Sequence, residues 1–195
     1  MQIEVLAFFL NLAGRLDYNR VNATAERGLL HMSKSVNWKA ALIAGGVAGV
    51  ISGLVKLGWE NVLPPRTPER NKTNPPQRLL EQAGIPKKIT HSTYTYSGEQ
   101  LPWVSYMIHF GFSTSFAMFY SLAGHYVPMI KMGDGTLFGL GVWGAFHLGI
   151  MPAMGTVPSA KDQPVEEHVS EALGHVVWMW TNDLIADEVY HKLTK

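Results

Sequence analysis

Apolar residues follow one another through the second half of the chain in two long stretches that carry no charge. The first stretch has 31 residues, from Gln100 to Ile130, and contains no Asp, Glu, Lys or Arg. A second stretch of 26 residues, from Gly135 to Ala160, follows almost at once and is equally free of these four residue types. Each stretch can supply the roughly 20 apolar residues that cross a hydrocarbon core about 30 Å thick. The pattern therefore predicts an integral membrane protein.

The whole pattern predicts an all-α, polytopic membrane protein built as a four-helix transmembrane bundle in a single domain, residues 32–195. A polar loop, 60–102, follows the first span. The helix is expected to end there because Pro64 and Pro65 restrict the residues before them and remove two backbone hydrogen-bond donors. The four expected spans are 40–59, 103–127, 135–154 and 169–185.

Small residues recur every four positions in two of the expected spans, so they share one helical face. Such a face lets a second helix approach closely, and packing of this kind drives helix association in lipid. The expected helix-packing residues are Gly45, Gly49 and Gly53 in the first span and Gly141 and Gly149 in the third.

The two ends of the chain are harder to interpret. Only 11 residues separate Glu171 from Asp183, so the fourth span must carry Glu171 inside or at its edge, and a peripheral helix is the alternative. Residues 1–31 are interpreted as an interfacial amphipathic helix or as an extension from an upstream start codon. Basic residues occur on both expected faces, so their distribution does not define the orientation.

Composition excludes several classes of site. The formal net charge is +1, which gives no reason to expect nucleic-acid binding. There is no cysteine, so disulfides and thiolate metal sites are excluded. No nucleophile elbow, phosphate-binding glycine loop or dinucleotide fingerprint is present. The sequence favours a membrane protein without enzymatic turnover over an enzyme.

Ionisable residues within the apolar spans are the candidate functional residues. Such groups are costly at membrane depth, and they normally face the bundle interior or a watery cavity. His168, Glu171 and His175 fall on one face of the last helix. The sequence predicts a shared polar centre or proton relay, and its candidate members are Lys56, Glu60, His109, His147, His168, Glu171 and His175.

Three interpretations of this centre remain open. In the first, neutral histidines join the helices by hydrogen bonds, because buried polar groups need partners. In the second, the centre senses or transfers protons, since histidine titrates near physiological pH. In the third, it binds a metal or haem; no cofactor is predicted outright, and the candidate metal ligands are His147, Glu171 and His175.

Several motifs of this chain are similar to those of the YagU-like family of bacterial inner-membrane proteins. The segment 49–60, running into Leu63-Pro64-Pro65-Arg66-Thr67-Pro68, resembles the first helix of that family and its exit. His147, the segment 152–156 and the segment 167–180 resemble its third and fourth helices. The resemblance covers roughly residues 38–182. It implies a small multi-pass protein of the bacterial inner (cytoplasmic) membrane, and it supplies no catalytic mechanism.

The leading functional hypothesis is a proton-responsive membrane protein that supports envelope or acid-stress tolerance. Glu171 and His175 exchange protons in this hypothesis, His109 and His147 complete the hydrogen-bond chain, and Lys56 pairs with Glu60. The alternatives are a structural or assembly subunit of a membrane complex and a metal- or haem-binding membrane protein. The expected partners are the lipid bilayer and either a second copy of the chain or another membrane protein.

Overall fold

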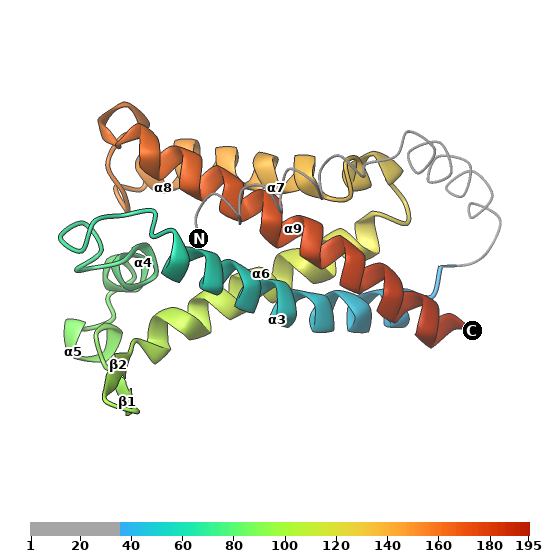
Figure 1. Ribbon diagram of the computed structural model, residues 1–195, viewed down its shortest axis with the longest axis horizontal. Helices are drawn as coiled ribbons and strands as arrows, with labels where there is room; N and C mark the ends of the chain where they lie inside the picture. Colours follow the sequence, from blue (N-terminus) through green and yellow to red (C-terminus); the bar gives the residue numbers. More distant parts are fainter. Residues whose placement is uncertain (1–35) are drawn as a thin grey trace.

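The computed structural model describes residues 36–195, and the expectation for residues 1–31 lies outside them. The described part is mostly helical, as predicted, and four long helical segments run along its longest axis (Figure 1). The first, second and fourth segments are single helices, and the third consists of three consecutive helical pieces. The segments are α3 (Trp38–Val62), α6 (Trp103–Ala123), the run of α7 (Thr136–Trp143), η2 (Gly144–Ile150) and α8 (Met151–Ala153), and α9 (Val165–Thr194).

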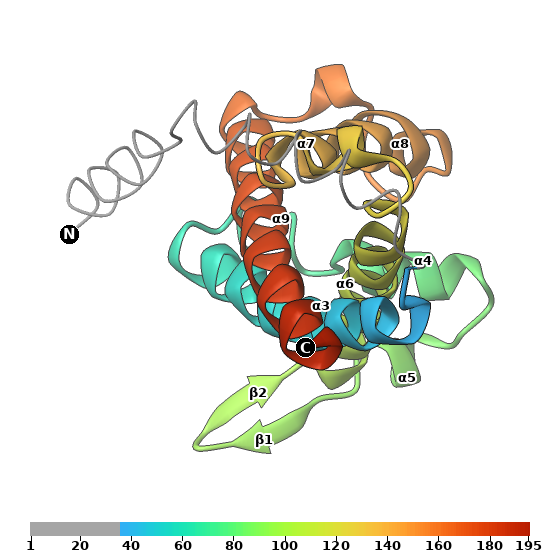
Figure 2. The ribbon, with the colours of Figure 1, turned by 90° about the vertical axis from the view of Figure 1, so that its right-hand side faces the viewer.

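The four segments surround the long axis of the molecule (Figure 2). α3 packs against both α6 and α9, and α7 packs mainly against α9. One hydroxyl joins three of the segments, because Ser113 Oγ of α6 donates to Gly49 O at 2.7 Å and accepts from Trp178 Nε1 at 2.7 Å. α3, α6 and α9 therefore form the tightest part of the bundle.

The polar loop after α3 is folded rather than simply solvated. It contains α4 (Pro75–Gln82), α5 (Lys87–Thr90), and the hairpin strands β1 (Tyr94–Tyr96) and β2 (Glu99–Leu101). Its turn places Ser97 and Gly98 at φ 53° and 86°, the left-handed pair that a tight hairpin turn requires. Two short 3₁₀ turns, η1 (Pro128–Lys131) and η3 (Ala160–Asp162), complete the connections.

Side-chain hydrogen bonds attach the folded loop to one end of the bundle. Asn74 caps α4, where its side chain accepts from the Gln77 backbone while the Gln77 side chain accepts from the Asn74 backbone. Asn74 Nδ2 also reaches Ser105 Oγ of α6 at 2.9 Å. Gln82 Nε2 donates to Met154 O at 2.9 Å, beyond α8. These hydrogen bonds therefore hold the folded loop against that end of the bundle.

On α3, small residues form the buried face and large apolar residues form the exposed face. The buried face of α3 consists of alanine, glycine and serine together with Lys56. Its exposed face carries Ile43, Val47 and Leu54, with Ile43 and Leu54 each 55% exposed. Water-soluble helices bury their large apolar residues instead. This inverted pattern suits a helix whose outer face contacts lipid.

Close helix contacts depend on glycines that sequence spacing identified only in part. A Cβ on Gly45 or Gly49 would lie 2.6 Å from the α6 backbone. In the third segment the structure differs from the expectation, because Gly141 has open space around its Cα and Gly149 has only Gly144 O, at 4.0 Å. Gly139 takes the close contact there, with its Cβ position 2.4 Å from His175 O. The reason is the rotation of α7 about its own axis, which turns the helix face that carries Gly139 toward α9.

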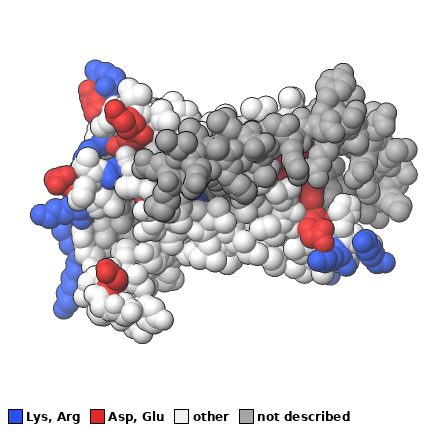
Figure 3. Space-filling model, in the orientation of Figure 1, with Lys and Arg blue, Asp and Glu red and all other residues white. Residues whose placement is uncertain are grey.

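Two described helical segments are long and apolar enough, by length and composition, to cross a membrane: Trp38–Val62 and Thr136–Ala153. α6 carries no Asp, Glu, Lys or Arg but is rich in serine and tyrosine, and α9 includes Glu171 and Asp183. In the view of Figure 3, Lys, Arg, Asp and Glu gather at the two ends of the long axis and the belt between them is uncharged over the described residues.

Candidate functional site

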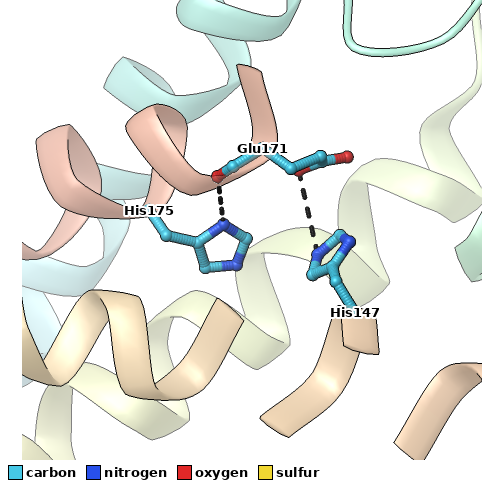
Figure 4. A group of neighbouring side chains, drawn as sticks. All are labelled: His147, Glu171 and His175. Carbon is cyan, nitrogen blue, oxygen red and sulfur yellow. Dashed lines mark hydrogen bonds and ion pairs between the residues drawn. The ribbon is translucent and has the colours of Figure 1, made fainter. Parts of the chain in front are cut away.

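Three segments bring a group of ionisable side chains together near the loop end of the bundle. α9 supplies Glu171 and His175, which are one helical turn apart and each 3% exposed. η2 supplies His147 from the opposite side (Figure 4). α3 supplies Lys56 and Glu60. All five side chains line one cavity of about 240 Å³, and apolar side chains of α6 and η2 line it as well.

The Glu171 carboxylate is the hub of this buried polar centre. Its Oε1 accepts from Arg66 Nη1 at 2.6 Å, and its Oε2 lies 3.4 Å from Lys56 Nζ. Lys56 also pairs closely with Glu60, one turn later on α3. The two cations and two carboxylates balance one another, so the centre is neutral when its histidines are neutral. Such balance is what permits charges to be buried at all.

The two histidines of the centre meet Glu171 in different ways. His175 Nδ1 donates to the Glu171 backbone oxygen at 2.8 Å, which fixes the orientation of the ring within α9. His147 Nε2 lies 3.8 Å from Glu171 Oε2, the oxygen that Lys56 also approaches. The two rings are edge-to-face with centroids 5.0 Å apart. A proton on His147 would therefore face the carboxylate directly.

The position of His147 depends on a local departure from the α-helix. Residues Gly144–Ile150 form a π-helix, and Pro152 follows in α8. Proline has no backbone N–H and clashes with the carbonyl four residues earlier, so the regular hydrogen-bond ladder cannot continue through it. π-helical turns often occur at functional sites, because the extra residue per turn redirects a side chain. Here it is His147 that lies on the widened turn.

The candidate metal ligands do come together, but their surroundings oppose a cation. One ligand atom from each of His147, Glu171 and His175 lies within 4.8 Å of the others. Both Glu171 oxygens, however, already face the positive charges of Arg66 and Lys56. A divalent cation would have to displace at least one of them and then remain close to both. The donor set therefore fits an ion-pair network better than a metal centre.

Two histidines expected in the centre make their hydrogen bonds outside it, and His168 is not among the residues that line the cavity. His109 contributes to the lining of the cavity, but its Nε2 contacts Gly53 O at 2.9 Å and joins α6 to α3. His168 Nε2 contacts Ala160 O at 2.8 Å and holds the connection before α9. Both rings are half-buried and bonded to backbone carbonyls, so each joins two parts of the backbone.

Sequence reasoning missed the arginines that complete the centre. Arg66 and Arg70 lie in the segment between α3 and α4, and they pair with Glu171 and Glu167 respectively. The two glutamates are four residues apart on α9, so they present their carboxylates on one face. We refer to these two ion pairs as the arginine latch. The Glu-x-x-x-Glu spacing and the Pro-Pro-Arg sequence were the available signals.

A second buried ion cluster lies near the other end of α9. Tyr120 Oη donates to Asp183 Oδ1 at 2.8 Å, and Lys131 Nζ lies 3.1 Å from the same oxygen. Lys131 also pairs with Asp187, one turn later. Glu171 and Asp183 are thus about 18 Å apart along α9, at 1.5 Å per residue. Each buried carboxylate of α9 faces a cation supplied by a connecting segment or a neighbouring helix.

The comparison with known proteins agrees with this membrane architecture. A family model described as "Protein of unknown function (DUF1440)" matches residues 50–184, which include the polar centre and the arginine latch. The chain belongs to this family. The DUF1440 match ends just beyond Asp183, so Glu171 and Asp183, the two buried carboxylates of the two ion clusters, lie within it, whereas Asp187 lies beyond it.

One curated relative shows where proteins of this kind reside. "Inner membrane protein YagU" of Escherichia coli (strain K12) is 32% identical over 176 aligned residues, which cover 79% of this chain and 86% of that protein. No solved structure matches this chain. The expected resemblance to the YagU-like family is confirmed. The chain is a protein of the bacterial inner membrane, and lipid surrounds its apolar helices.

Proposed function

We propose that this chain is a proton-responsive inner-membrane protein, in which a four-helix transmembrane bundle holds the polar centre and the arginine latch. α6, with 21 residues, is about 31 Å long at 1.5 Å per residue and matches the hydrocarbon thickness. In α9 the charges of Glu171 and Asp183 face inward and are paired, while Val169, Leu173 and Leu184 face outward. These features support four spans.

The response follows from the charge balance around Glu171. With neutral histidines, the positive charges of Lys56 and Arg66 equal the negative charges of Glu60 and Glu171. A proton on His147 adds a third cation at 3.8 Å from Glu171 Oε2, the oxygen that Lys56 approaches, so the charge of the carboxylate is shared among three cations and less of it remains for Arg66 on Oε1. His175 lies beside it, and His109 lies at the cavity margin. Acidification therefore weakens the Arg66–Glu171 pair.

Loss of that pair would release the segment between α3 and α4. The arginine latch supplies the charged contacts between this segment and α9. In its second pair, Arg70 with Glu167, the arginine side chain is more exposed than that of Arg66. Partly exposed pairs contribute little alone, on the order of 0–1 kcal/mol. The segment would therefore move away from α9 at acid pH. A change of this kind on the membrane surface suits a role in envelope or acid-stress tolerance.

The test is a distance measurement between two spin labels. The chain has no cysteine, so Lys72→Cys and Lys161→Cys, both at exposed positions, give one labelled pair across the latch. The pulsed electron resonance distance should lengthen between about pH 7.5 and about pH 4. His147→Gln should abolish the change. His168→Gln is the matched control and should retain it, because the His168 ring bonds to the Ala160 carbonyl and does not line the cavity around Glu171.

Two results would overturn the proposal. The first is a label distance that stays the same at both pH values in the otherwise unaltered chain. The second is a change that persists in the His147→Gln variant, which would assign the response to another group.

A further inference from the structure

An apolar groove lies beside the polar centre, between α6 and the third helical segment of the bundle. The cavity at the centre is lined on these two sides by Phe112 of α6 and by Phe146 of η2. A second cavity of about 490 Å³ continues from Phe146 toward the other end of the bundle. Its lining comes from α6, η1 and α7 and includes Phe116, Phe119, Leu137, Gly141 and Ala145. Phe146 lines both cavities, so they adjoin at its side chain.

The two ends of the region formed by these adjoining cavities differ in chemistry. One end has Lys56, Arg66 and His147 around Glu171. The lining of the other end contains no charged residue among those described, and its rim is exposed, with Phe119 56% and Leu137 53% exposed. In a membrane this rim faces acyl chains. A ligand that fills both parts must carry a polar head and a long apolar tail.

The charges of the centre select the head. Lys56 and Arg66 are already balanced by Glu60 and Glu171, so a bound anion needs one further positive charge. A protonated His147 can supply one such charge, which suits a head with a single negative charge. We infer that the protein binds a long-chain carboxylic acid, with the carboxylate of the acid at the polar centre and its hydrocarbon tail in the groove between α6 and α7.

This inference rests on the proposed function, because His147 is the group that takes up the proton in both. It adds a ligand class, since a fatty acid and a proton would enter the site together. The groove opens sideways along exposed apolar side chains, so the acid can arrive from the bilayer. Ligand pockets of about 300–1,000 Å³ are typical, and the volumes of the two cavities taken together fall in that range.

The test uses a photoactivatable palmitate analogue with the full chain in lipid nanodiscs. Cross-links mapped by mass spectrometry should concentrate on 116–119 and 137–146. Gly141→Leu should reduce labelling of the groove about tenfold, because Gly141 has open space where the new side chain would fill the groove. Gly46→Leu is the matched control, since Gly46 also has open space but lies on α3, outside the groove. It should leave labelling unchanged.

A second probe separates a binding site from ordinary lipid contact. The corresponding hexadecanol analogue has the same chain and no carboxyl group, and it should label the groove much less at about pH 5. Equal labelling by both probes would overturn the inference, as would palmitate labelling spread evenly over the outer faces of α3 and α9. The spin-label response distinguishes the two proposals. If acid still releases the latch while palmitate fails to label the groove, the ligand inference is wrong and the proton response stands.

Discussion

Glu171 is the residue on which the buried charges depend. It faces Arg66 at 2.6 Å and Lys56 at 3.4 Å, and its own side chain is 3% exposed. Breaking a buried ion pair by removing one partner costs more than the pair contributes, because the remaining charge stays buried without compensation. The arrangement is therefore sensitive to the charge of this one carboxylate.

Glu171→Gln should destabilise the protein by about 3–5 kcal/mol, because the positive charges of Lys56 and Arg66 lose half of their compensation. The measurement is the free energy of unfolding in detergent. Glu166→Gln is the control: Glu166 lies on the same helix and is exposed, so its substitution should change stability by less than about 0.5 kcal/mol. Equal effects of the two substitutions would mean that Glu171 is not the hub.

The residues of the centre were predictable from the sequence to different degrees. Ionisable groups on apolar segments pointed to Lys56, His147, Glu171 and His175, and the structure places all four around one cavity. His109 and His168 have the same signal, yet His109 bonds to the Gly53 carbonyl of α3 and His168 to the Ala160 carbonyl before α9, because the position of each ring is set by neighbours that spacing does not specify. Arg66 lies in a connecting segment, whose fold no periodicity indicates.

At the scale of the elements, close helix contacts depend on which side of a helix faces its neighbour. The third segment has small residues at several positions, and the sequence spacing favoured Gly141 and Gly149. The structure instead places Gly139 against the His175 carbonyl. Spacing identifies a face shared by several residues, but it does not say which face meets α9.

Gly139→Ala should destabilise the protein by about 1–3 kcal/mol, because its Cβ would overlap the α9 backbone beside the polar centre. Gly141→Ala, two residues later in the same helix, should be neutral or slightly stabilising, since its Cβ meets open space. The midpoint of thermal unfolding in detergent compares the two. Loss of stability in Gly141→Ala alone would reverse the assignment of the packed face.

The folded loop has a titratable contact of its own outside the membrane spans. Desolvation alone would raise the pKa of Glu81, but hydrogen bonds from His91 and Thr90, with the nearby charge of Lys87, hold that pKa below its ordinary value. A carboxylate with a lowered folded pKa stabilises the fold above its unfolded pKa. That stabilisation is lost as the pH falls through the folded pKa.

The contact between α4 and α5 should therefore loosen in acid below about pH 4. Limited proteolysis with an acid protease should cut residues 83–92 faster as the pH falls in that range. Glu81→Gln should make the cutting rate at the upper end of the range resemble that of the acidified parent chain. Unaltered cutting in both tests would show that Glu81 does not hold these two helices together.

At the scale of the whole molecule, the many large apolar side chains that are exposed on the described helices are those expected of a protein surrounded by lipid. The long uncharged stretches predicted this environment, and the family relationship confirms the inner membrane. The folding of the loop and the groove between α6 and α7 could not be predicted, because both depend on contacts between segments far apart in sequence. Buried ion pairs near both ends of α9 then allow a charged helix to belong to the bundle.

The most direct measurement of the central claim is nitrogen NMR of the histidine side chains in lipid nanodiscs. The His147 signal is assigned as the one missing from the His147→Gln variant. The account predicts one protonated ring nitrogen at about pH 7.5 and two at about pH 4, with the second proton appearing together with the lengthening of the label distance across the latch. A His147 ring that keeps one proton over this range while the latch still opens would contradict it.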